Sequence, residues 1–277
     1  MGPPSLALPQ GNGQERRAAC PVVRAWLVLL LVPLAGCFGG DDDPAPPAPP
    51  PATPFTFGGE GCREFVVLLP LPAGNVRPLL PDRFRMVGED AGQATVGATL
   101  LRCAETTVAG EAHGEAAQAE AGVLIESPDG SDATHFYELW LTSELADLTQ
   151  RLDRFGVFGG PMAEPTVALP VEAPGGLLLG TAQASVPWQE GPYHLVLDVA
   201  GPPAPLPLGS SVWWHQGRDG FVAITYNLTE VRGHLGAGTV EAVGGPMGDM
   251  LGGAAADGPG FLASFGFTAD VAYVRLP

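Results

Sequence analysis

Ser211-Val-Trp-Trp-His-Gln-Gly-Arg-Asp-Gly-Phe-Val-Ala-Ile-Thr-Tyr-Asn-Leu-Thr-Glu230 is the stretch of sequence that decides the fold. Two runs rich in aromatic and β-branched residues flank an Asp-Gly pair, which is a strong signal for a β-hairpin. The loop is centred on either Arg218-Asp219 or Asp219-Gly220, which gives two possible registers. Both registers place Trp213 and His215 on the same face of the hairpin as Val222, Ile224 and Tyr226. The hairpin predicts that antiparallel sheet dominates the fold.

Outward from this hairpin, short strand-like runs recur along the chain. They lie at 64–71, 94–102, 122–126, 135–142, 166–169, 177–186 and 194–200. The last run, 261–273, alternates well, with apolar residues at every second position. Between the hairpin and this run, residues 232–260 contain ten glycines, and we expect a loop there with a turn of helix at 247–251.

One α-helix is expected, after Ser143 and before Gly156. Leu145, Leu148, Leu152 and Phe155 form one apolar stripe at helical spacing, Ser143 can cap its start, and Glu144 falls in its first turn. Gly156 ends it. About ten strands and one helix predict a mainly β, α+β fold: an antiparallel, closed or nearly closed β-barrel-like sheet with one packed α-helix.

A second motif bears on location. Arg16, Arg17 and Arg24 precede a short apolar run at 25–36, which is the pattern of a secretory signal. The run ends in Leu34-Ala35-Gly36-Cys37, which resembles the lipobox of prokaryotic lipoproteins. The resemblance implies that Cys37 is lipidated and becomes the mature N-terminus; the alternative is a chance match in an alanine- and glycine-rich chain.

These motifs predict that the chain has three parts, and they predict its cellular location. Residues 1–37 are a lipoprotein signal peptide, 38–57 an Asp/Pro-rich spacer, and 58–277 a single β-rich extracytoplasmic domain. We expect the protein at the cell membrane, lipid-anchored through Cys37 on the extracytoplasmic face.

Charge and composition exclude several classes of function. The chain of 277 residues carries a formal charge of −17, which disfavours nucleic acid as a partner. All 13 basic residues are arginine, so no lysine can form a Schiff base with a carbonyl substrate. No metal-binding motif and no cofactor motif occurs, so we expect no metal and no cofactor.

Two cysteines remain in the predicted domain. Outside the cytoplasm, Cys62 and Cys103 are most simply a disulfide. The alternative is a pair of buried free thiols.

The strand at 135–142 carries the most suggestive side chains. Phe136, Glu138, Trp140 and Thr142 share one face by alternation. If that face lines a cavity, burial raises the pKa of Glu138 and makes it a candidate acid or base; if the face is outside, Glu138 is solvated.

Trp213 and His215 complete the candidate pocket. Trp213 and Trp214 point to opposite faces, so at most one lines any pocket. For His215 the ordinary alternative is a hydrogen-bonded structural histidine. Asn227-Leu228-Thr229 is a glycosylation sequon inside an apparent strand.

Three fragments resemble the acetoacetate-decarboxylase-like superfamily. They are Val-Arg-Pro-Leu-Leu-Pro-Asp-Arg-Phe at 76–84, Ala-Thr-Val-Gly-Ala-Thr-Leu-Leu at 94–101 and Phe-Tyr-Glu-Leu-Trp at 136–140. The resemblance implies a closed β fold around an apolar pocket, with Glu138 at the position of the pocket carboxylate. The family's decarboxylases use a Schiff-base lysine that this chain lacks, so the resemblance carries over the cavity and not that activity.

Two hypotheses of different classes follow. In the first, a lipid-anchored domain binds a small, partly apolar ligand or an envelope protein without covalent catalysis. In the second, the chain is an enzyme that uses Glu138 as acid or base, with Arg77 or Arg102 holding an anionic substrate. A structural cell-surface module remains if neither a pocket nor a patch exists.

The lipobox yields a first test. A Cys37→Ser variant loses its acyl chains, so we expect it to leave the membrane fraction and to incorporate no radiolabelled fatty acid. Cys20→Ser, which lies inside the predicted signal peptide, is the matched control and should fractionate like the unchanged protein. Membrane association of Cys37→Ser at the level of the control would contradict the assignment.

Overall fold

The computed structural model of this chain describes residues 52–174 and 176–276. The predicted signal peptide, Cys37 and the spacer up to residue 51 lie outside the described residues. Within the described ranges, no helix combines the length and the apolar character that crossing a membrane requires.

Strands make up most of the described chain. They are β1 (Phe55–Pro72), β2 (Gln93–Val108), β3 (Glu111–Leu124), β4 (Thr134–Ser143), β5 (Thr166–Ala168), β6 (Glu172–Ala173), β7 (Leu177–Val186), β8 (Tyr193–Gly201), β9 (Ala204–Pro205), β10 (Ser210–Gln216), β11 (Phe221–Ala242) and β12 (Ala255–Val274). The helices are α1 (Ala73–Val76), α2 (Ala146–Phe155) and α3 (Gly245–Leu251), with short 3₁₀ turns η1 (Arg77–Leu79) and η2 (Glu89–Ala91). The mainly β prediction is confirmed.

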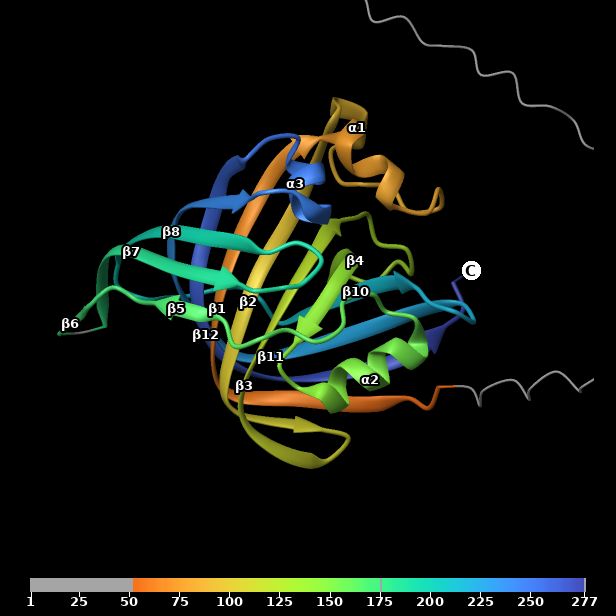
Figure 1. Ribbon diagram of the computed structural model, residues 1–277, viewed down its shortest axis with the longest axis horizontal. Coiled ribbons are helices and arrows are strands. Elements are labelled where there is room, and N and C mark those ends of the chain that lie inside the picture. The colour runs from red at the N-terminus through yellow and green to blue at the C-terminus, as the bar shows by residue number, and fades with distance from the viewer. Residues whose placement is uncertain (1–51, 175, 277) are drawn as a thin grey trace, which may run out of the picture. The chain divides into compact units, whose positions relative to one another are not determined.

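The hydrogen bonds of the sheet run in a ring. The strand order is β10-β4-β3-β2-β1-β12-β11, and β10 also pairs with β11, which closes the circuit. Strands β8, β7 and β5 continue from the far half of β11 and fold across β1 and β2 (Figure 1), while the two-residue strands β6 and β9 pair with β7 and β11. One expectation needs correction: the β10–β4 pair is parallel, so the sheet is not wholly antiparallel.

The hairpin predicted at 211–230 is present. Gln216 pairs with Phe221, so Arg218-Asp219 is the loop centre. Trp213 lies opposite Ile224 and His215 opposite Val222, so both side chains share the face of Val222, which either register required.

The predicted loop at 232–260 is wrong, although the turn of helix expected at 247–251 is present as α3. β11 runs on to Ala242 and β12 begins at Ala255, and the two pair through most of this segment. The glycines are needed because other backbone comes close: a Cβ on Gly236 would lie 2.0 Å from the carbonyl oxygen of Asp198, and one on Gly258 would lie 1.9 Å from that of Leu68. Glycine at these positions lets another strand's backbone approach closely. From the sequence alone, the same glycines indicate a loop.

Other boundaries also move. β1 begins at Phe55, before the expected domain start at residue 58, because Phe55 and Phe57 are buried and pair with Val271 and Ala269. β3 begins at Glu111 instead of near Gly122, in a stretch whose alanines and glutamates do not favour strand.

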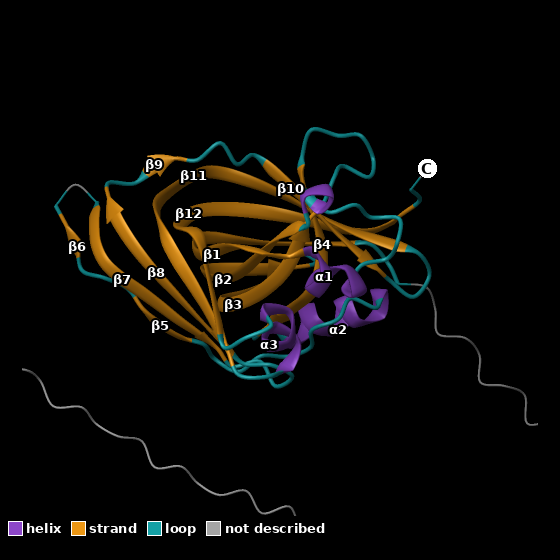
Figure 2. Cartoon of the chain, turned by 90° about the horizontal axis from the view of Figure 1, so that it is seen from above, coloured by secondary structure: helices purple, strands orange, loops and turns teal. Residues whose placement is uncertain are grey.

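The predicted helix is α2, with a different start. Leu148, Leu152 and Phe155 of its apolar stripe are buried, Leu145 just before it is half-buried, and Gly156 ends it in the left-handed conformation. The Ser143 hydroxyl accepts a hydrogen bond from the Leu145 N–H, just before the helix. Glu144 lies outside the first turn, because its carboxylate accepts a hydrogen bond from the N–H of Ala117 in β3. Two further helices, α1 and α3, add residues to the core (Figure 2).

Apolar side chains form two clusters. One lies on the outer face of β1–β3, under β7 and β8, and includes Val67, Leu100 and Leu197. The other lies inside the ring, where the alternating residues of β12 from Ala263 to Val271 point. Cys62 and Cys103 form a disulfide between β1 and β2 beside this inner cluster.

The close strand crossings give a second prediction. Gly236→Ala places a methyl group against the backbone of β8, and such overpacking costs about 1–3 kcal/mol of unfolding free energy. Gly209→Ala is the control, since nothing lies within 4 Å of its added carbon. Urea unfolding should show a lower midpoint for Gly236→Ala alone; equal midpoints would refute the packing argument.

Candidate functional site

The ring of strands encloses a cavity of about 250 Å³. Its walls are mostly apolar and come from the inward faces of β1, β2, β3, β4, β10, β11 and β12. The apolar and aromatic lining residues are Val66, Leu68, Leu101, Leu124, Phe136, Leu208, Trp213, Tyr226, Leu228, Phe261, Phe265 and Phe267. The exposed residues Thr134 and Ser210 also line it, so the cavity reaches the surface beside the first residues of β4 and β10.

A hydrogen-bonded polar cluster interrupts the apolar lining. The Gln118 side-chain amide donates to Glu120 at 2.6 Å and to the Tyr226 hydroxyl at 3.3 Å, and that hydroxyl donates a short hydrogen bond to Glu120. Glu64 lines the same cavity from β1. Three strands far apart in sequence therefore bring two carboxyl groups, an amide and a phenol to one place.

The carboxyl groups of this cluster titrate near neutral pH. Burial, and after it the charge of Glu120, raises the pKa of Glu64 to about 8. Glu64 keeps partial exposure because it borders the cavity, yet protein otherwise surrounds it and sets its pKa. Burial raises the pKa of Glu120 to about 7, against the opposing effect of the hydrogen bonds from Tyr226 and Gln118. At neutral pH the pair therefore holds protons that exposed glutamates would have lost.

Glu138 is a further carboxyl group whose pKa the charge of Glu120 affects, although Glu138 does not line the cavity. Its side chain is 0% exposed, and neither oxygen has a hydrogen-bond partner among the described residues. Burial, followed by the charge of Glu120, raises its pKa well above the usual value. A buried carboxyl without partners costs roughly 1–3 kcal/mol even when neutral.

Trp140 does not share the pocket with Phe136. The register between β3 and β4 shifts at Ala121–Gly122, so Leu139 is a bulged residue and the alternation along β4 is broken. Trp140 instead stacks on Trp188, with ring centroids 5.1 Å apart, in the outer cluster. The expectation that one face carries both aromatics is therefore wrong, because a bulge adds a residue to one strand only.

Phe136 and Trp213 do come together in the cavity wall. They are paired across the parallel strands and their rings stack with centroids 4.5 Å apart. His215 has a different position: its ring nitrogens face the backbone carbonyl oxygens of Glu138 and Gly156, each at 2.9 Å. Burial lowers the pKa of His215 although those carbonyls oppose the shift, which fits a structural histidine.

Four polar residues of the site escaped sequence reasoning: Glu64, Gln118, Glu120 and Tyr226. The signal for Gln118 and Glu120 was present, because they alternate with alanines in a strand whose alanine face is buried. Glu64 stands at the start of an apolar run and reads as its solvated end. Only ring closure reveals that these side chains share an interior.

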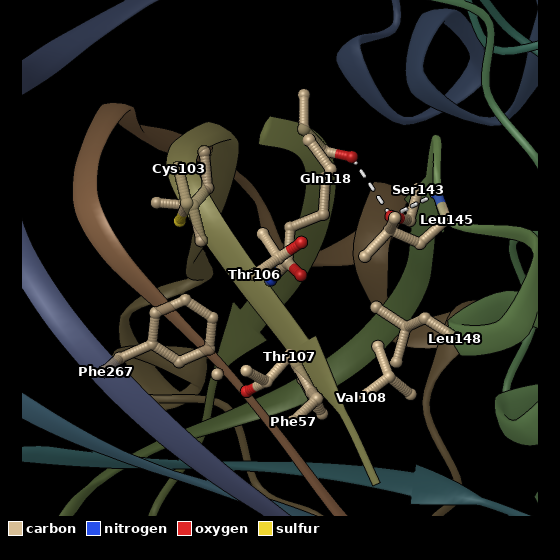
Figure 3. Close-up of a pocket in the computed structure, with 14 residues that line it drawn as sticks. Phe57, Cys103, Thr106, Thr107, Val108, Gln118, Ser143, Leu145, Leu148 and Phe267 are labelled. Atoms are coloured by element: carbon tan, nitrogen blue, oxygen red, sulfur yellow. Dashed lines mark hydrogen bonds between the residues drawn. The ribbon is translucent and has the colours of Figure 1, made fainter. Parts of the chain in front are cut away.

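A second, much smaller cavity lies near the disulfide and the start of α2. It measures about 10 Å³, room for a single water. Figure 3 shows Cys103, Gln118, Ser143 and Leu148 around it, with the Ser143 hydroxyl hydrogen-bonded to the backbone of Ala117 and Leu145. It does not hold an organic ligand.

No arginine or histidine lines the larger cavity among the described residues. Arg77 donates to the carbonyl oxygens of Leu80, Pro81 and Phe84, and Arg102 pairs with Glu115 and Glu164. Neither arginine therefore serves Glu138 as a substrate clamp, contrary to the expectation of the enzyme hypothesis. In the described part of the chain, no group of three or more potential ligand side chains is arranged to hold a metal.

The fold is that of acetoacetate-decarboxylase-like proteins. An acetoacetate-decarboxylase-like enzyme from Sphingomonas wittichii superposes with a TM-score of 0.56 at 12% identity, covering 82% of this chain and 94% of its own. The enduracididine biosynthesis enzyme MppR, complexed with pyruvate, gives 0.52 at 14% identity over 78% and 88%. Acetoacetate decarboxylase from Legionella pneumophila gives 0.51 at 12% identity over 86% and 94%. No protein-family model and no curated protein matches the sequence.

The raised pKa values make stability depend on pH. The folded protein keeps protons on Glu64 and Glu120 that the unfolded chain releases near pH 4.5, so stability falls as pH rises from about 5 to about 8. At roughly 1.4 kcal/mol per pKa unit, Glu120 alone accounts for a loss on the order of 3 kcal/mol. Urea unfolding across this range measures it.

Variants identify the source of that slope. Glu64→Gln/Glu120→Gln should reduce the decline to the part that Glu138 contributes, because an amide mimics the protonated acid and does not titrate. Glu115→Gln, at an exposed surface pair, should keep it. A decline that persists unchanged in the double variant would show that other groups cause it.

Proposed function

We propose that this protein binds a small, largely apolar molecule inside the ring of strands, without a covalent bond. The observation that carries the proposal is the 250 Å³ cavity, whose aromatic walls surround the cluster of Glu64, Gln118, Glu120 and Tyr226. Apolar walls with a few convergent polar groups and shifted pKa values are the usual features of a ligand site.

The size of the cavity bounds the ligand. An apolar protein cavity of about 150 Å³ accommodates benzene. The present cavity is larger, so it accepts a ring with a short polar chain. The polar end of such a molecule would meet the carboxyl cluster, while the ring would contact Phe136, Trp213 and the phenylalanines of β12.

The chemistry of the site separates it from the decarboxylases of the same fold. Imine formation needs an amine, and the chain has no lysine. The neighbours named for acetoacetate and for pyruvate act on or bind small keto acids. This chain keeps the fold and a cavity, and replaces covalent attachment with hydrogen bonding and apolar contact.

A second candidate is proton-transfer catalysis, and Glu138 is the observation that favours it. A fully buried carboxyl without hydrogen-bond partners is costly, and function is the common reason for keeping one. Glu120 both lines the cavity and acts on Glu138 electrostatically. In this version the pair exchanges a proton with the α-carbon of a bound neutral carbonyl compound.

The lipid anchor is part of the proposal. The lipobox at Cys37 and the disulfide between Cys62 and Cys103 both support a place outside the cytoplasm, since disulfides persist in oxidising compartments. The site would then face material outside the cell.

Filling the cavity tests the binding proposal. At Gly97 an added Cβ would meet the side chains of Phe136 and Leu68 at 3.4 and 3.7 Å and the backbone oxygen of Gly122 at 3.9 Å, an ordinary contact distance, so Gly97→Leu projects into the cavity without a backbone clash. We expect 2-phenylethanol to raise the melting temperature of the unchanged protein and to have no effect on Gly97→Leu. Gly253→Leu, at an open position, is the control. Equal responses from all three proteins would refute binding inside the ring.

The catalytic version has its own test. Proton NMR in D₂O follows loss of the α-protons of 4-phenyl-2-butanone, and Glu138→Gln should abolish any acceleration while 2-phenylethanol binding persists. Exchange at the same rate in Glu138→Gln would leave binding as the function.

A further inference from the structure

We infer that the ligand of this cavity is a small organic cation, an ammonium group on an apolar or aromatic body. This inference rests on the proposed binding function and names its ligand class. The ammonium would lie against Glu64 and Glu120, and the body would fill the aromatic part of the cavity.

The charges around the cavity favour a cation over an anion. Its lining contains two carboxyl groups and no cationic side chain among the described residues. An anionic keto acid entering this site would meet Glu64 and Glu120 with no arginine or lysine to balance its charge. Burying an unpaired charge is costly, so the lining disfavours anions.

The aromatic rings also favour a cation. Phe136, Trp213, Tyr226, Phe261, Phe265 and Phe267 all line the cavity. Tyr226 lies between Trp213 and Phe267, with ring centroids 6.5 and 5.6 Å away. Ring faces attract cations, and aromatic walls with carboxylates are how proteins recognise ammonium groups.

The hydrogen bonds of Glu120 also favour a cation. Its Oε1 already accepts from Tyr226 and from Gln118, which prepares the group to be an anion once a counter-charge arrives. Among the described residues no donor is seen on the Glu64 carboxyl, so a bound ammonium N–H would supply a partner for it. The formal charge of −17 would also draw cations toward the molecule.

Binding of a cation must then expel a proton. A glutamic acid of the cluster becomes glutamate when the ammonium binds, and the released proton goes to the buffer. A neutral ligand gives no such release, so proton release separates the two ligand classes.

The test uses three probes of similar shape: 2-phenylethylammonium, 2-phenylethanol and 3-phenylpropanoate. Calorimetric titration of the full-length protein near pH 6.5, in two buffers of different ionisation enthalpy, measures both affinity and proton release. We expect the ammonium to bind about tenfold or more tightly than the alcohol, with proton release, and the carboxylate to bind least.

Variants localise the effect. Glu64→Gln and Glu120→Gln should each lower affinity for the ammonium about tenfold and leave affinity for the alcohol within about twofold, whereas Glu115→Gln should change neither. Proton release is measured on the unchanged protein, so it remains decisive even if a variant folds poorly.

The possible failures are distinguishable. Alcohol binding as tight as ammonium binding, or tightest binding of the carboxylate, would overturn the cation inference and leave the cavity as a ligand site. Absence of binding by all three probes would overturn the proposed function with it.

Discussion

The pairing of β10 with both β4 and β11 is the constraint on which the rest of this structure depends. Without it, β4 and β11 would be separate parts of an open sheet, and the residues facing inward would face solvent. Closure turns one face of seven strands into an interior, and that interior holds both a packed aromatic region and a cavity. Every shifted carboxyl pKa described above follows from that enclosure, because burial is the first cause of each shift.

Inside the ring, polar groups are held in two ways. Glu120 accepts hydrogen bonds from Tyr226 and Gln118, which oppose the rise of its pKa, whereas neither oxygen of Glu138 has a partner among the described residues and burial raises its pKa well above the usual value. Burial raises the pKa of each carboxyl group by a different amount, so one group of the site ionises more readily than the others. Glu138 costs stability, which supports the proposed function for this part of the ring, whereas both ring nitrogens of His215 face backbone carbonyls, as in a structural histidine.

Local periodicity was enough to predict the hairpin at 211–230, the alternation of β12 and the apolar stripe of α2, since neighbours in sequence determine each of them. It failed where distant backbone decides. The glycines of 232–260 are explained only by the approach of Asp198 and Leu68, and Trp140 leaves its expected face because β3 and β4 differ by one residue at Leu139. Glu64 and Glu120 could be recognised as a site only after the pairing of β1 with β2 and of β2 with β3 placed them on one face, and closure made that face an interior.

The parallel ladder between β10 and β4 has a consequence for how a ligand would enter and leave the cavity. It joins only Ser211–Trp214 to residues 134–137, the shortest ladder around the ring, and the cavity reaches the surface at that end. Thermal separation there sacrifices fewer hydrogen bonds than anywhere else in the circuit. The β10–β4 ladder that closes the ring is thus also the part of the ring that opens most easily. The residence time of a bound ligand would then depend on how often those four residue pairs separate.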